Sequence, residues 1–266
     1  MRRRLDVEMV RRGLAASRSE ARDAIQSGLV TVAGSVATKA GTLVAADQPI
    51  DLTGASRRYA SRGGDKLAPA LERLGVEVAG RRCLDAGAGT GGFTDVLLEG
   101  GAEHVVAVDV GYGQFAWRLR TDPRVTLLER FNVRNLRPDD LPFAPDLVVA
   151  DLSFISLVTV LPALAGAAAP DADFVLLVKP QFEAGRKEVG RGGVVSDPST
   201  WASAVERVAL GCVEAGIGPL AVAVSALRGP AGNVEFFLHA RKGAEPRRLQ
   251  IGDAVEEASR TVGERR

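Results

Sequence analysis

Residues 85–93 read Asp85-Ala86-Gly87-Ala88-Gly89-Thr90-Gly91-Gly92-Phe93. The run Arg82–Ala86 at the start of this stretch has the composition of a β-strand, and Phe93–Leu98 at its end has the pattern of a helix. Glycine lets the backbone turn tightly and approach a ligand without an intervening side chain. A strand, a glycine-rich loop and a helix in this order predict the ligand-binding loop of an α/β fold.

From Asp65 onward the sequence alternates between helix-like and strand-like segments. The expected helices are Lys66–Leu74, Phe93–Leu98, Gln114–Leu119, Leu157–Ala168 and Trp201–Ala215, and the expected strands are Arg82–Ala86, His104–Asp109, Val125–Leu128, Asp146–Asp151 and Phe174–Lys179. Such alternation predicts a parallel sheet with helices on both faces. Two last strands, Leu220–Val224 and Val234–His239, have no helix between them, which favours an antiparallel pairing. We therefore expect a Rossmann-like class I methyltransferase fold with a mostly parallel seven-stranded sheet, because this ending departs from a dinucleotide dehydrogenase.

The first part of the chain is basic and differs in pattern from the rest. Residues 1–62 hold 11 Arg and Lys against 6 Asp and Glu, a net charge of +5, although the whole chain has a net charge of only +1. Two short helices, Val7–Leu14 and Ser17–Gln26, and two short strands, Leu29–Val32 and Pro49–Leu52, predict a small α/β domain. Guanidinium groups on one surface match phosphate oxygens, so we expect an RNA-binding domain; the alternative is a solvated arginine-rich helix face.

The expected RNA contacts are Arg4, Arg11, Arg12, Arg18, Arg22 and Arg62. We place the RNA-binding domain at residues 1–55, a linker at 56–64, the methyltransferase domain at 65–242 and a charged C-terminal tail at 243–266.

The glycine-rich loop fits two cofactors. Gly87, Gly89 and Gly92 satisfy the dinucleotide fingerprint, and Asp109 supplies a ribose-binding carboxylate, so glycine spacing leaves NAD and S-adenosylmethionine open. Asp85 is placed to receive a methionine ammonium, and no basic residue in the loop meets a pyrophosphate, which favours S-adenosylmethionine over NAD or an ordinary tight turn. The expected cofactor-binding residues are Asp85, Gly87, Ala88, Gly89, Thr90, Gly91, Gly92, Asp109, Asn132, Val133 and Asp151.

Four charged residues fall where the predicted fold brings strand ends together. Asp151 and Lys179 end two apolar strands, and Glu235 lies at the start of the last strand. Lys66 lies at the start of the first helix of the domain. Ligands of open α/β sheets bind beyond the carboxyl ends of the parallel strands. We therefore expect Lys66, Asp151, Lys179 and Glu235 to form one catalytic site, the alternative being strand-end surface charges.

The residue types favour a hydroxyl as the methyl acceptor. Asp151 is followed by Leu152-Ser153-Phe154, without the proline pair typical of exocyclic amine methylation. Cys83 and Cys212 lie in a strand and a helix, so neither is placed as the nucleophile that pyrimidine carbon methylation needs. Lys179 is the candidate for taking the hydroxyl proton or for acting as a fixed positive charge on the developing oxyanion. Lys66 would orient the hydroxyl, and Glu235 would hold Lys66 or the substrate ribose.

Several motifs together resemble the TlyA family, bacterial 2′-O-methyltransferases with an FtsJ-like catalytic domain. They are Arg58-Tyr59-Ala60-Ser61-Arg62-Gly63-Gly64-Asp65-Lys66-Leu67, Gly87–Gly92, Asp151-Leu152-Ser153-Phe154-Ile155-Ser156, Val178-Lys179-Pro180-Gln181-Phe182-Glu183 and Gly232-Asn233-Val234-Glu235-Phe236. Ser17–Gly34 is similar to the small RNA-binding fold of ribosomal protein S-four. The family's Lys-Asp-Lys-Glu tetrad carries over onto Lys66, Asp151, Lys179 and Glu235. Gly89 departs from the family, where serine is commoner.

The resemblance implies cytidine 2′-O-methylation of 16S rRNA, 23S rRNA or both, in assembled 30S or 50S subunits. The segment before Leu5 and the long tail resemble the longer subtype, which modifies both rRNAs. Tyr59, Phe154 and Phe182 are expected stacking partners for a flipped base, with core packing as the alternative for the phenylalanines.

Three other functions remain open: a non-catalytic RNA-binding or ribosome-assembly factor, a methyltransferase acting on a small-molecule or protein hydroxyl, and a haemolysin. We expect a cytoplasmic protein without a membrane-spanning run and assign no metal site. The target nucleotide and the oligomeric state are not predicted.

Overall fold

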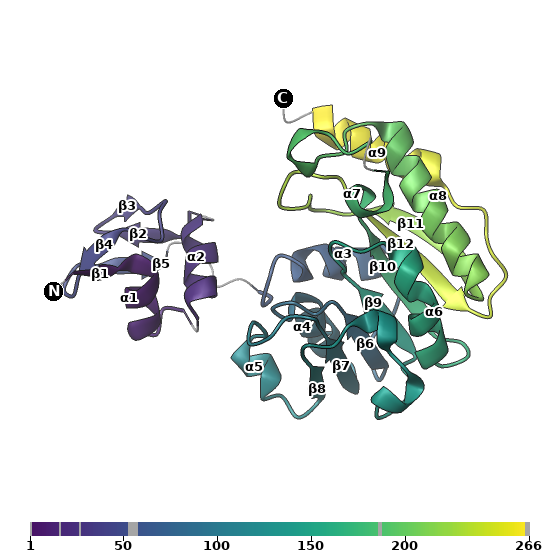
Figure 1. The fold of residues 1–266 in the computed structure, drawn as a ribbon, viewed down its shortest axis with the longest axis horizontal. Helices are drawn as coiled ribbons and strands as arrows, with labels where there is room; N and C mark the ends of the chain where they lie inside the picture. The colour runs from purple at the N-terminus through teal and green to yellow at the C-terminus, as the bar shows by residue number, and fades with distance from the viewer. Residues whose placement is uncertain (1, 16, 27, 53–57, 186–187, 264–266) are drawn as a thin grey trace. The chain divides into compact units, whose positions relative to one another are not determined.

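A computed structural model describes residues 2–15, 17–26, 28–52, 58–185 and 188–263 of the chain. The chain divides into two compact units, Met1–Arg58 and Tyr59–Arg266 (Figure 1). Each unit has its own hydrophobic core, so each is described by itself.

The smaller unit packs two helices against short antiparallel strands. Helices α1 (Leu5–Arg11) and α2 (Arg18–Gln26) contribute Leu5, Met9 and Ile25 to its core. Strand β2 (Val30–Val32) pairs with β3 (Ser35–Val36) and β5 (Ile50–Leu52), and β1 (Arg2–Arg4) pairs with β4 (Leu43–Ala45). The strands β1, β3 and β4 were not predicted, because two or three residues give no readable alternation and β1 consists of three arginines.

The larger unit is built on one seven-stranded sheet with the order β11-β12-β10-β9-β6-β7-β8. The strands are β6 (Arg82–Ala86), β7 (His104–Val108), β8 (Val125–Leu128), β9 (Leu147–Ala150), β10 (Asp173–Val178), β11 (Ile217–Val224) and β12 (Phe236–Lys242). The first five are parallel to one another, whereas β12 runs antiparallel to both β10 and β11. The predicted mostly parallel sheet with an antiparallel ending is confirmed, and β12 lies between β10 and β11.

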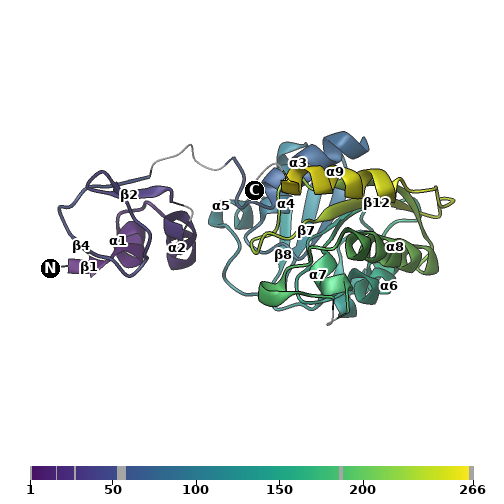
Figure 2. The ribbon, with the colours of Figure 1, turned by 90° about the horizontal axis from the view of Figure 1, so that it is seen from above.

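Helices cover both faces of this sheet, as Figures 1 and 2 show. One face carries α3 (Gly64–Leu74), α4 (Gly92–Glu99) and α5 (Trp117–Arg120), which pack on a core that includes Cys83. The other face carries α6 (Leu157–Ala167) and α8 (Pro198–Glu214), which pack on a core that includes Leu84. Neighbouring residues in a strand point to opposite faces, which is why consecutive residues belong to different cores. The short helical segments are α7 (Pro180–Glu183), η1 (Val133–Asn135), η2 (Pro138–Asp140) and η3 (Arg191–Gly193).

The region predicted as a charged tail contains the helix α9 (Ile251–Gly263). Ala254 and Ala258 are buried in the same core as α8, and Arg73 of α3 forms an ion pair with Glu257 at 2.5 Å. The charged residues mask an apolar stripe with helical spacing, so the composition of the tail hides its packing. No helix within the described parts of the chain is both long and apolar enough to cross a membrane.

Candidate active site

The sheet brings three of the four predicted catalytic residues to one edge. Asp151 directly follows β9 and Lys179 directly follows β10, so both lie at the carboxyl ends of neighbouring parallel strands. Glu235 directly precedes β12, and Val178 pairs with Phe236 in the antiparallel ladder, which places Glu235 beside Lys179. The fourth residue, Lys66, lies in the first turns of α3.

Lys66 and Glu235 form a buried ion pair. The distance between Lys66 Nζ and Glu235 Oε2 is 2.6 Å, and the two side chains are 7% and 1% exposed. Burial raises the pKa of Glu235, while the positive charge of Lys66 opposes that shift. Glu235 also interacts electrostatically with Lys179 and Asp151. The four charged groups therefore share one site, and their catalytic roles stay predictions.

Lys179 has two oxygen partners on the segment that follows β9. Its Nζ lies 2.5 Å from Asp151 Oδ1 and donates a hydrogen bond to Ser153 Oγ at 3.0 Å. The ring of Phe182 lies 5.8 Å from the same nitrogen. Lysine Nζ and carboxylate oxygen are close enough here to orient each other without a substrate.

The glycine-rich loop contacts the same segment. Gly87 has φ +86°, and a Cβ at this position would lie 2.4 Å from the carbonyl oxygen of Asp151. Gly91 has φ +97°, and its Cβ would collide with Leu119. Both positions therefore require glycine, for conformation and for space. At Gly89 a Cβ would meet no atom within 4 Å, so a side chain there would project into open space.

Asp85 ends up completely buried beneath this loop. Thr94 donates a hydrogen bond to its Oδ2 at 2.6 Å, while Oδ1 has no hydrogen-bond partner among the described residues. Burial raises the pKa of Asp85 to about 7, and the negative charges of Asp151 and Asp109 add to that shift. A buried carboxylate oxygen without a donor fits the ammonium group of a bound ligand.

The other predicted cofactor residues have partners within the protein. Asp109 accepts hydrogen bonds from the backbone of Gly89 at 2.8 Å and of Gly111 at 2.6 Å, so its carboxylate holds the loop in place. The Asn132 side chain caps η1, and the Val133 side chain is buried in the core. The expected cofactor contacts of Asn132 and Val133 stay predictions.

Residues 59–242 match the FtsJ-like methyltransferase family, and residues 3–50 match the S4 domain. The chain is 56% identical to the 16S/23S rRNA (cytidine-2′-O)-methyltransferase TlyA of Mycobacterium tuberculosis, over 90% of each chain. The chain belongs to the TlyA family. It is therefore a methyltransferase with an N-terminal S4 domain.

Two further relatives align with nearly the whole length of this chain. YqxC of Bacillus subtilis, named provisionally as an rRNA methyltransferase, is 41% identical over 99% of this chain and 96% of its own. A solved protein of Streptococcus thermophilus that carries a provisional haemolysin name is 37% identical, covers 100% of this chain and 99% of its own, and has a TM-score of 0.78.

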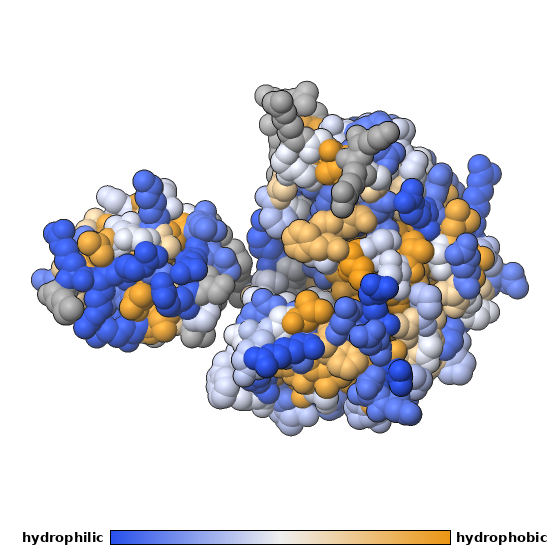
Figure 3. All heavy atoms as spheres, in the orientation of Figure 1, coloured by the Kyte–Doolittle hydropathy of each residue, from blue (hydrophilic) through white to orange (hydrophobic). Residues whose placement is uncertain are grey.

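The arginines of the S4 domain surround two buried carboxylates. Asp6 accepts hydrogen bonds from Arg4, Arg18 and Arg22, whose side chains are 47%, 52% and 48% exposed. Glu8 likewise binds three arginines: Arg3, Arg11 and Arg12. Hydrogen bonds from Arg4 and Arg11 hold the pKa of Asp6 and of Glu8, respectively, well below their usual values. Hydrophilic residues cover most of the face of this domain seen in Figure 3.

Two of the predicted RNA contacts have structural roles of their own. Arg12 donates to the carbonyl oxygens of Ala45, Ala46 and Gln48, and its side chain is only 21% exposed, so it connects α1 to the turn after β4. Arg62, in the larger unit, donates to the carbonyl oxygen of Arg228 at 3.2 Å.

Tyr59 is buried in the core of the larger unit and is thus unsuited to base stacking, whereas Phe154 is 92% exposed.

Thr94 and Ser153 were not among the predicted site residues, yet they form hydrogen bonds with Asp85 and Lys179, respectively. In the sequence, only their proximity to the glycine-rich loop and to Asp151 pointed to these two residues.

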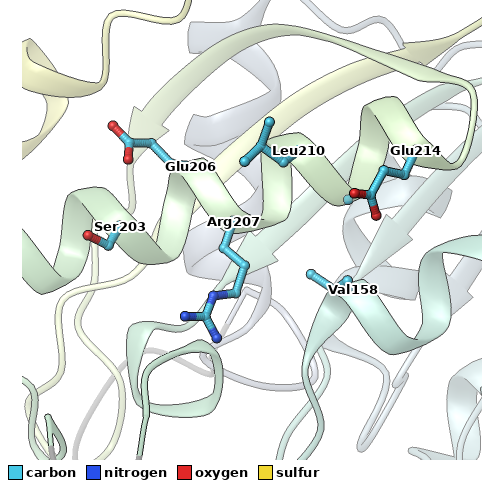
Figure 4. A pocket seen from close by; sticks show the side chains of 7 residues that line it. Val158, Ser203, Glu206, Arg207, Leu210 and Glu214 are labelled. Carbon is cyan, nitrogen blue, oxygen red and sulfur yellow. The ribbon is translucent and has the colours of Figure 1, made fainter.

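Cys83 and Cys212 are free and buried as predicted, and burial raises the pKa of each thiol to about 12. A shallow depression lined by Val158 of α6 and by residues of α8 contains none of the predicted site residues (Figure 4).

We predict that the Lys66–Glu235 pair is strongly coupled in stability. Lys66→Met leaves a buried carboxylate without its partner and should lower the free energy of unfolding by about 3–5 kcal/mol. The double variant Lys66→Met/Glu235→Gln should recover much of that loss. Urea denaturation of the single and double variants measures the coupling.

The control is the exposed pair of Arg124 and Asp122, whose atoms lie 2.8 Å apart. Arg124→Met should cost about 0–1 kcal/mol, because exposed ion pairs are screened by water. Equal losses for Lys66→Met and Arg124→Met would contradict the buried pairing.

Proposed function

We propose that this TlyA-family protein transfers a methyl group from S-adenosylmethionine to the 2′-hydroxyl of a cytidine in rRNA. The observation that carries the proposal is the meeting of two lysine–carboxylate pairs, Lys66–Glu235 and Lys179–Asp151, beside the glycine-rich loop. A ribose hydroxyl is a weak nucleophile, so its activation needs a proton acceptor and positive charge. The name of the 56% identical M. tuberculosis relative states this reaction, and the name of YqxC supports methylation of rRNA.

When bound, S-adenosylmethionine supplies a methyl carbon on a positively charged sulfur. Asp85 fits its ammonium group, because its buried Oδ1 has no donor among the described residues. Gly87 and Gly91 let the loop pack closely against Asp151 and Leu119, and the open space next to Gly89 would let a ligand come close to the backbone. These residues would hold the cofactor at the carboxyl ends of the parallel strands.

The chain's own residues handle the hydroxyl and its proton. Lys179 would take the proton as the new O–C bond forms, and its ion pair with Asp151 Oδ1 at 2.5 Å supports this role by holding the amine at the site. Lys66, held by Glu235, would orient the hydroxyl from the other side. General-base action of this kind contributes roughly 10²–10⁴-fold in rate.

The S4 domain would bind the RNA backbone. Arg18 and Arg22 are about half exposed and are held by Asp6, so their remaining N–H groups can face phosphates. Arg12 is the least suited of the predicted contacts, because it is largely used within the domain. We infer that the substrate is rRNA within 30S or 50S subunits, and hence that the protein acts in the cytoplasm.

The central prediction concerns Lys179. With tritiated S-adenosylmethionine and ribosomal subunits, the wild-type protein should label RNA, and alkaline-hydrolysis resistance should map the label to a 2′-O-methylcytidine. Both Lys179→Ala and Lys179→Arg should lose roughly 100-fold or more of the rate. Arginine keeps the positive charge but does not give up its proton, so it separates proton transfer from charge stabilisation.

Retained labelling in Lys179→Ala would remove Lys179 from catalysis. Cofactor binding by each variant, measured by calorimetry, shows whether the site is still formed. Absence of label in the wild type would favour a non-catalytic RNA-binding or assembly factor, and activity that survives deletion of residues 1–58 would favour a small-molecule or protein hydroxyl. The same sample, assayed for lysis of erythrocytes, tests the haemolysin name.

A second prediction separates the two arginine groups of the S4 domain. Arg22→Ala should weaken RNA binding and reduce the slope of log affinity against log salt by about 0.7–0.9, the amount for one phosphate contact. Arg12→Ala should instead destabilise the domain, because three backbone carbonyls lose their donor. Filter binding at several salt concentrations and thermal unfolding give the two readouts. Equal salt slopes for Arg22→Ala and the wild type would contradict the assignment.

A third prediction follows from the pKa of Asp85, which burial raises to about 7. A ligand ammonium favours the ionised carboxylate, so below pH 7 cofactor binding must release a proton. The affinity should therefore rise about tenfold per pH unit up to about pH 7 and then level off. Calorimetry between about pH 5.5 and 7.5, below the usual range of an α-amino group (about 7.7–8.0), measures the effect.

Asp85→Asn is the control for this pH dependence. It should bind the cofactor more weakly and without the slope, because the amide does not titrate. An affinity of the wild type that is constant below pH 7 would place the ammonium away from Asp85.

A further inference from the structure

Ser153 connects the buried catalytic lysine to the protein surface. Its Oγ accepts a hydrogen bond from Lys179 Nζ at 3.0 Å. The Lys179 side chain is 9% exposed, whereas Ser153 is an exposed residue. Among the described contacts, no comparable hydroxyl serves the other lysine, since the contact recorded for Lys66 Nζ is with the buried Glu235.

Asp151 and Ser153 constrain the Lys179 amine together. Lys179 Nζ donates a hydrogen bond to Ser153 Oγ at 3.0 Å, and the ion pair with Asp151 Oδ1 places a carboxylate oxygen 2.5 Å from the same nitrogen. Ser153 is therefore the residue that gives the amine a directional contact, whereas Asp151 acts on it through charge.

The backbone holds Ser153 in place from both sides. Before it, the Asp151 N–H donates to the carbonyl oxygen of Ala86 at 3.0 Å. After it, Glu183 accepts hydrogen bonds from Ser156 Oγ at 2.6 Å and from the Leu157 N–H at 2.7 Å. The segment that carries Ser153 is therefore attached to β6 and to α7, the helix that begins next to Lys179.

Phe154, the next residue, adds a conformational constraint. It has φ +63°, a left-handed conformation that is costly for a residue with a large side chain. Its ring centroid lies 5.2 Å from that of Phe182 in α7. The left-handed turn thus directly follows Ser153, and the Phe154 ring packs against α7, the helix that begins after Lys179.

We infer that Ser153 is a positioning residue that orients Lys179 and opens a path for its proton to water. The inference rests on the proposed function. As the ribose O–C bond forms, the S–C bond breaks with its electron pair left on sulfur, and the hydroxyl proton passes to neutral Lys179. Lys179 then gives a proton to Ser153 Oγ while the Ser153 hydroxyl proton passes to water, which restores the neutral amine.

The test compares Ser153→Ala with Ser153→Thr in the full-length protein, using ribosomal subunits and tritiated S-adenosylmethionine. Ser153→Ala should lower kcat about tenfold or more, the effect of losing one hydrogen bond to a charged group. The KM for subunits and the Kd for the cofactor should not change, because the inference gives Ser153 no contact with either. Ser153→Thr keeps a hydroxyl and should regain most of the rate.

Ser203→Ala is the matched control, because Ser203 is an exposed serine on α8 that lines the depression in Figure 4. It should leave kcat unchanged. Wild-type kcat in Ser153→Ala would overturn the inference and leave the assignment of Lys179 intact. A higher KM for subunits with unchanged kcat would also overturn it, since Ser153 would then bind RNA. A wild-type protein that labels no RNA would overturn both the inference and the proposed function.

Discussion

The antiparallel pairing of β12 with β10 is the constraint on which the site depends. In a wholly parallel sheet the residue before a strand lies at the edge opposite to the carboxyl ends. Because β12 runs the other way, its first residues meet the last residues of β10, and Glu235 comes to lie beside Lys179. The reversal of one strand thus adds a carboxylate to the edge where parallel strands already place Asp151 and Lys179.

Most of the charged groups at this edge of the sheet are buried. Lys66 and Glu235 are almost completely enclosed, and a buried ion pair is costly to form and costly to break. Asp85 is enclosed as well, and burial raises its pKa to about 7. Lys179 differs because Ser153 links it to the surface. The same site therefore combines a buried ion pair with one lysine that is hydrogen-bonded to an exposed serine.

The S4 domain uses its charges in a different way. Asp6 and Glu8 each gather three arginines, so most of the positive side chains are oriented before any RNA arrives. An arginine count from the sequence does not distinguish these groups. Arg12 and Arg22 look equivalent in the sequence, yet Arg12 supports the turn after β4 while Arg22 remains half exposed. The difference arises from contacts between segments more than thirty residues apart.

Periodicity and strand ends were enough to predict the α/β fold, the glycine-rich loop and the convergence of Asp151 and Lys179, because these follow from local patterns and from the known geometry of parallel sheets. Lys66 and Glu235 were also predicted at this site, and their positions depend on α3 and on the antiparallel β12. Packing decided the rest. The burial of Val133 and the role of Ser153 depend on which side chains meet across the molecule, and so does the docking of α9, whose charged residues obscure its apolar stripe. Such contacts leave no periodic signal along the chain, so only the folded structure reveals them.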